Sequence, residues 1–69
     1  MHLDRLVNLL EIIAVVGRPV SVAEVQVASG LPKPTCYRLV QTLTELGLIE
    51  EAESEGRYII GDRLIRIAL

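Results

Sequence analysis

The sequence predicts a mainly α-helical fold with a small β-hairpin, the winged helix-turn-helix. Apolar residues recur at intervals of three and four over three segments, and the pattern then changes to two short runs separated by Ser54-Glu55-Gly56. Hydrophobic residues make up 51% of the chain and the net charge is only −2, which excludes a disordered chain. Because 26 of the 69 residues are Leu, Ile or Val, and Phe and Trp are absent, the core must be aliphatic.

The first helix is predicted over residues 3–16. One apolar set recurs at helical spacing, and a second set occupies much of the side that should face water. Two interpretations follow: the helix is wedged between two neighbouring elements, or a partner covers its second apolar side. Gly17, Arg18 and Pro19 then end the helix. The first set is Leu3, Leu6, Val7, Leu10, Ile13 and Ala14, and the second is Leu9, Ile12, Val15 and Val16.

The second helix is predicted over residues 21–29, starting from a capping box. In the run Ser21-Val22-Ala23-Glu24, the serine hydroxyl can accept a free backbone N–H and the glutamate carboxylate can reach back to the cap. Gly30 is placed to end this helix. Pro32 and Pro34 fit the tight connection that follows, where backbone N–H groups would be unpaired in any case.

The third helix is predicted over residues 33–46 and ends at Gly47. Its apolar positions fall on one side at spacings of three and four, which leaves a polar side free of acidic residues as far as Thr44. The apolar side is formed by Cys36, Leu39, Val40, Leu43 and Leu46, and the polar side by Lys33, Thr35, Tyr37, Arg38, Gln41, Thr42 and Glu45.

A β-hairpin, the wing, is predicted over residues 48–60, so that residues 1–61 form the domain and residues 62–69 start a further helix. Four of the nine acidic residues lie in the hairpin: Glu50, Glu51, Glu53 and Glu55. These four lie within residues 50–55, so the other 63 residues carry seven basic and five acidic residues, a net charge of +2. The glutamates are interpreted as a solvated strand edge that discourages pairing with other strands.

Composition excludes most catalytic and membrane functions. The only histidine is His2, so no Ser, His and Asp triad can form, and no phosphate-binding glycine motif is present. We therefore expect neither an enzyme nor a cofactor. The single cysteine, Cys36, can form no internal disulfide and no structural zinc site, which favours a cytoplasmic protein. The longest apolar run, 12–16, is far too short to span a membrane.

The polar side of the third helix is suited to double-stranded DNA. Lys33 and Arg38 can pair with phosphate or guanine, and Thr35, Tyr37 and Gln41 can reach base edges. Arg57 starts the return strand of the wing and could support binding from there. The simpler alternative is that every surface helix has a wet side on which two basic residues are ordinary.

Several segments together resemble the DNA-binding domain of IclR-type bacterial transcriptional regulators. The resemblance covers nearly the whole chain. Its most specific part is the Gly-Leu-Pro-Lys segment leading into Tyr-Arg-Leu, followed by the Gly-Arg-Tyr wing. The matching segments are 17–24, 30–40, Leu43, 46–47 and 56–61.

This resemblance implies the N-terminal part of a longer regulator whose C-terminal domain binds a small organic effector. It implies a homodimer, or a dimer of dimers, on a palindromic operator, with the first and last helices in the dimer contact. It places Lys33, Thr35, Tyr37 and Arg38 against DNA, and Ser21 could direct the start of the second helix at a phosphate.

Three positions depart from the family pattern. Pro34 replaces a Ser or Ala and removes a hydroxyl and an N–H from the recognition helix, which puts one DNA contact in doubt. His2 replaces a Ser or Thr cap. Cys36 takes the place of a small apolar residue and is interpreted as a buried structural thiol rather than a redox sensor.

Two alternatives to DNA binding remain at this point. One is a protein interaction module that uses the winged helix without DNA, with the first helix as its docking face. The other is a regulatory domain fused to an enzyme.

Overall fold

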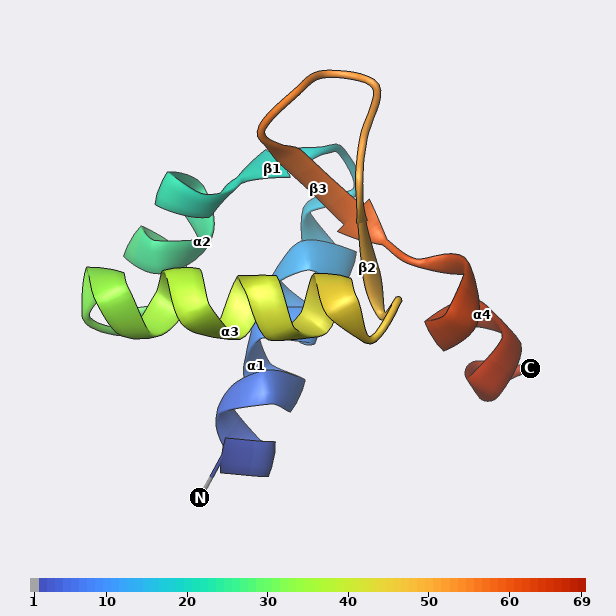
Figure 1. Cartoon of the computed structure of the whole chain (residues 1–69), viewed down its shortest axis with the longest axis horizontal. Coiled ribbons are helices and arrows are strands. Elements are labelled where there is room, and N and C mark those ends of the chain that lie inside the picture. Colours follow the sequence, from blue (N-terminus) through green and yellow to red (C-terminus); the bar gives the residue numbers. More distant parts are fainter. Residues whose placement is uncertain (1) are drawn as a thin grey trace.

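A computed structural model describes residues 2–69, apart from the side chain of His2, and confirms the winged helix-turn-helix (Figure 1). Three helices come first, with a short strand between the first two, and the wing hairpin and a fourth helix follow. In chain order the elements are α1 (His2–Val16), β1 (Val20–Ser21), α2 (Val22–Ser29), α3 (Lys33–Glu45), β2 (Ile49–Glu51), β3 (Arg57–Ile60) and α4 (Asp62–Ala68).

The sheet has a third strand that the sequence did not predict. Its order is β1-β3-β2, and both neighbouring pairs are antiparallel. In the β1–β3 pair, Val20 lies opposite Tyr58 and Ser21 lies opposite Arg57. A strand of two residues is too short to show an alternating pattern, so only the pairing with β3 reveals it. This pairing brings the start of α2 beside the wing.

The core is aliphatic, as expected, and α1 contributes to it through one side. Leu9 and Ile13 are buried, whereas Leu3, Val7 and Val15 are exposed. The sequence assigned Leu9 to the second apolar side and Leu3 to the first, and this assignment is wrong. Spacing alone does not show which side packs when both sides are apolar. The buried residues are Leu9, Ile13, Val20, Val25, Cys36, Leu39, Val40, Leu43 and Ile49.

The helix-turn-helix unit has well-defined caps. Ser21 and Glu24 form the expected capping box, in which Ser21 Oγ accepts from the Glu24 backbone N–H at 3.1 Å and Ser21 N–H donates to Glu24 Oε1 at 3.0 Å. Gly30 ends α2 at φ +72°, a left-handed conformation that favours glycine. These caps fix the angle at which α2 leads into α3.

Polar contacts hold helix α4 to the wing and to the end of α3. The Asp62 backbone N–H donates to Glu50 Oε2 at 2.7 Å, and Arg63 Nη1 donates to the Leu46 carbonyl at 2.8 Å. At the other end of β2, Glu51 Oε2 accepts from the Gly56 N–H at 2.7 Å and closes the wing turn. Glu50 and Glu51 thus lie exposed on an edge strand, as expected, and also hold two local structures.

Candidate nucleic-acid interface

Helix α3 buries one side and presents the other to solvent. Cys36 and Leu43 are fully buried, and Lys33, Arg38 and Gln41 are exposed. Tyr37 is 47% exposed, although it is the largest apolar side chain on the helix. The polar side therefore offers cations, an amide and a phenol on one helix, as the sequence predicted.

A shallow groove of about 740 Å³ runs beside α3. The polar side of α3 forms one wall, and Val22 at the start of α2 and Tyr58 on β3 form the other. Three of the predicted DNA-contacting residues line it together. The lining consists of Val22, Pro34, Tyr37, Arg38, Val40, Gln41, Thr44, Glu45 and Tyr58.

Two more predicted residues lie at the start of α3. Lys33 Nζ lies 5.9 Å from the centre of the Tyr37 ring, within the range of a cation–π interaction. Thr35 is half-buried and does not line the groove. Two residues correspond to about 200° of helical turn, so Thr35 lies on nearly the opposite side of the helix from Tyr37.

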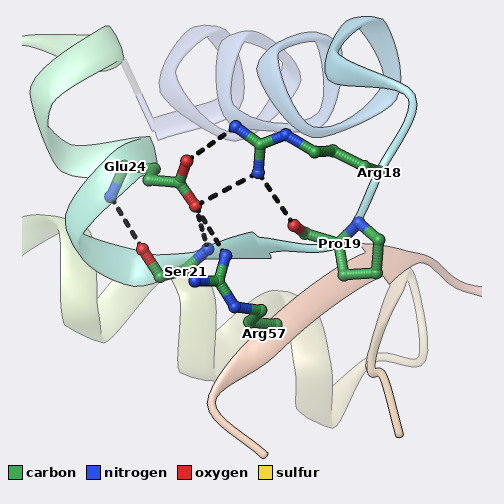
Figure 2. Close-up of polar contacts among 5 residues, drawn as sticks. All are labelled: Arg18, Pro19, Ser21, Glu24 and Arg57. Atoms are coloured by element: carbon green, nitrogen blue, oxygen red, sulfur yellow. Dashed lines mark hydrogen bonds and ion pairs between the residues drawn. The ribbon is translucent and has the colours of Figure 1, made fainter. Parts of the chain in front are cut away.

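The other two predicted residues, Ser21 and Arg57, lie opposite each other in the β1–β3 pair and belong to a charged cluster (Figure 2). Glu24 is its centre. Arg18 Nη2 lies 2.8 Å from Glu24 Oε2, and Arg57 Nη1 lies 3.0 Å from Glu24 Oε1. The same Oε1 accepts the Ser21 backbone N–H. One carboxylate thus joins the loop after α1, the cap of α2 and the wing.

These donors stabilise the charged form of Glu24. The hydrogen bond from Arg18, followed by the backbone hydrogen bond from Ser21, lowers the pKa of Glu24 from 4.5 to about 2. Burial acts in the opposite direction on Cys36 and raises the pKa of its thiol. Cys36 is fully buried, as expected for a structural thiol.

Several residues of the interface were missed in the sequence. Thr44 follows Gln41 by three residues and Tyr37 by seven, so helical spacing could have added it to the polar side. Glu45, which the sequence had already placed on the polar side, adds a carboxylate to the lining of the groove. The residues around Tyr58 and Arg18 in the sequence do not indicate that these two belong to the interface, because only the pairing of β1 with β3 brings them to it.

Every helix within residues 2–69 falls short of the length and apolar character that a membrane span requires. No three His, Cys, Asp or Glu side chains of the described part lie close enough together to hold a metal ion.

Comparisons with known proteins agree on one family. Residues 2–53 match the family model described as the IclR helix-turn-helix domain. The glycerol operon regulatory protein of Streptomyces coelicolor is 29% identical over 65 residues, which are 94% of this chain and 26% of that protein. The chain therefore spans about a quarter of the length of this curated relative.

Solved structures show the same fold. The repressor BlcR of Agobacterium tumefaciens is 32% identical, with a TM-score of 0.85 over 96% of this chain and 26% of that one. An IclR homologue from Microbacterium hydrocarbonoxydans, solved with 4-hydroxybenzoate, is 28% identical, with a TM-score of 0.90 over 100% of this chain and 28% of that one.

Proposed function

The chain belongs to the IclR helix-turn-helix domain family, whose members are DNA-binding transcriptional regulators, and from this premise we propose that it binds double-stranded DNA sequence-specifically. The observation that carries the proposal is the polar side of α3. Tyr37, Arg38 and Gln41 line one open groove, with Lys33 beside them. A helix of this kind fits the major groove, where arginine recognises guanine and glutamine recognises adenine by paired hydrogen bonds.

In this proposal each residue of the interface has a role. Arg38 and Lys33 anchor guanine or phosphate, and Tyr37 and Gln41 reach base edges. Thr35 contacts the DNA phosphate backbone at the edge of α3, because its half-buried side chain cannot reach far into the major groove of the DNA. Ser21 and Arg57 lie beside the groove wall that Val22 and Tyr58 form, and they bind DNA phosphates rather than bases.

The chain would act as a dimer on a palindromic site. Leu3, Val7, Leu10 and Ala14 follow one another on α1 at spacings of four, three and four, which is the repeat of a two-helix seam. Leu3 is 57% exposed, Val7 is 44% exposed and Ala14 is also exposed, whereas Leu10 is half-buried, so most of this stripe is open to a second copy. Ile65 and Ile67 of α4 are also exposed and offer a second apolar surface to a partner copy.

We further propose that the domain serves an effector-responsive cytoplasmic regulator that is not an enzyme. The chain spans about a quarter of its relatives, and one of these was solved with a small organic acid. A separate effector-binding domain agrees with both facts.

Selection from a random duplex library tests the proposal. The protein is expected to enrich one sequence with two inverted half-sites. A protein interaction module with no DNA function would leave the library unchanged. Enrichment of a single half-site without an inverted repeat would support DNA binding but contradict the dimer.

A further inference from the structure

The cluster of Arg18, Glu24 and Arg57 carries more positive charge than it neutralises. Two guanidinium groups share one carboxylate, which leaves a net charge of +1. The three side chains are 57%, 39% and 45% exposed in that order, so the charge is open to a ligand.

Hydrogen-bond donors of the two arginines also remain available. Arg18 donates through Nη1 and Nη2 to the Glu24 carboxylate and through Nη1 to the Pro19 carbonyl. Arg57 donates to Glu24 through Nη1 alone among the contacts of residues 2–69. A guanidinium has five N–H donors in a fixed planar arrangement, which suits the oxygens of a phosphate.

The cluster lies next to the groove beside α3. Ser21 and Arg57 lie opposite each other in the sheet, and the residue after each of them, Val22 and Tyr58, forms the second groove wall. A helix with its side chains is about 10–12 Å across and fills a major groove about 12 Å wide. With α3 in the DNA major groove, the phosphate backbone at the edge of the major groove therefore passes next to the wall formed by Val22 and Tyr58.

We propose that Arg18 and Arg57 together bind a backbone phosphate beside the recognition helix, and that Glu24 is the positioning residue that holds both guanidinium groups toward it (Figure 2). This inference rests on the proposed DNA binding and adds Arg18 as a contact. Arg18 is six residues from Glu24 and Arg57 is 33 residues from it, so the site exists only in the folded domain.

Arg18→Gln tests the assignment by the salt dependence of DNA affinity. The probes are a duplex selected from a random library and a scrambled duplex of equal length. A phosphate contact has no sequence preference, so both affinities should fall by about fivefold at 0.15 M salt for each protomer bound. The slope of log affinity against log salt should become shallower by about 0.9 per protomer, or about 1.8 for a dimer. Arg18→Lys keeps the charge and should keep the slope.

Arg66→Gln is the matched control, because Arg66 is also an exposed arginine paired with a carboxylate, Asp62, and lies on α4 outside the groove. Its slope should equal that of the unaltered protein. If Arg18→Gln matches this control while Arg38→Ala weakens binding, the phosphate site is wrong and the DNA-binding function stands. If the unaltered protein binds neither duplex, both proposals fail. Thermal unfolding of each variant confirms that the domain is folded.

Discussion

We expect the sequence preference of the α3 surface to depend most on Arg38. Its side chain is exposed in the groove and makes no hydrogen bond or ion pair within residues 2–69. It can therefore contact a base without first breaking a contact in the protein. Arg38→Ala should weaken binding to the selected duplex by about 1–3 kcal/mol, the effect of losing a paired contact to guanine.

A binding titration against the selected duplex measures this effect. The scrambled duplex should lose much less affinity, because a base contact carries sequence preference. Equal losses on both duplexes would make Arg38 a phosphate contact instead.

Glu24 should make the stability of the domain depend on pH in the acid range. Its pKa falls from 4.5 to about 2 on folding. A carboxylate with a lowered folded pKa stabilises the fold above its unfolded pKa, and this contribution is lost as the pH falls from about 4.5 toward 2. Glu24→Gln keeps the hydrogen-bonding shape of the capping box and removes the titration.

Urea unfolding at pH 7 and at pH 3 separates the two proteins. The stability difference between the unaltered protein and Glu24→Gln should be smaller at pH 3 than at pH 7. A difference that does not change with pH would contradict the role of this carboxylate.

At the scale of elements, the junction between the wing and α4 depends on close backbone packing at Gly61. Gly61 has an ordinary extended backbone at φ −82°, and its N–H donates to the Leu48 carbonyl at 2.8 Å. A Cβ at this position would lie 2.3 Å from the Gly47 carbonyl oxygen. Gly61→Ala should therefore destabilise the domain by about 1–3 kcal/mol, a typical cost of overpacking. An unchanged urea midpoint would show that the backbone can move aside freely.

Helix α1 should mediate dimerisation through its exposed stripe. Val7→Glu places a charge in the proposed seam, and the protein should sediment as a monomer where the unaltered protein is a dimer. Val27→Glu is the control, because Val27 is 78% exposed on α2 and lies outside the stripe. A dimer that survives Val7→Glu as well as it survives Val27→Glu would place the interface elsewhere.

Elements with a local signal could be predicted from the sequence, and elements without one could not. The capping box at Ser21, the glycine at position 30 and the apolar spacing of α3 act within a few residues, so the helices and their ends follow from local rules. Strand β1 and the packed side of α1 depend on contacts between distant segments.

The same distinction applies to the candidate site. Helical spacing predicted that Tyr37, Arg38 and Gln41 share one side of α3, which the structure shows. Spacing gave no sign that Arg57 pairs with Glu24, because 33 residues separate them and the sheet alone brings them together. The sequence therefore predicted Arg57 as a DNA contact but did not predict that Glu24 holds it in place.

At the scale of the whole molecule, the net charge of −2 hides an uneven distribution. The wing and its turn carry four glutamates, two of which hold local structure, while the polar side of α3 has Glu45 as its one acidic residue. Affinity for DNA depends on the charge that faces the phosphates rather than on the total. An acidic protein can therefore still show steep salt dependence.

The affinity of the unaltered protein for the selected and the scrambled duplex, measured over a salt series, decides whether the domain recognises a DNA sequence. Sequence-specific DNA binding predicts tighter binding to the selected duplex at every salt concentration and a steep fall of both affinities as salt rises. Equal affinities for the two duplexes, or a weak interaction that salt does not change, would contradict it.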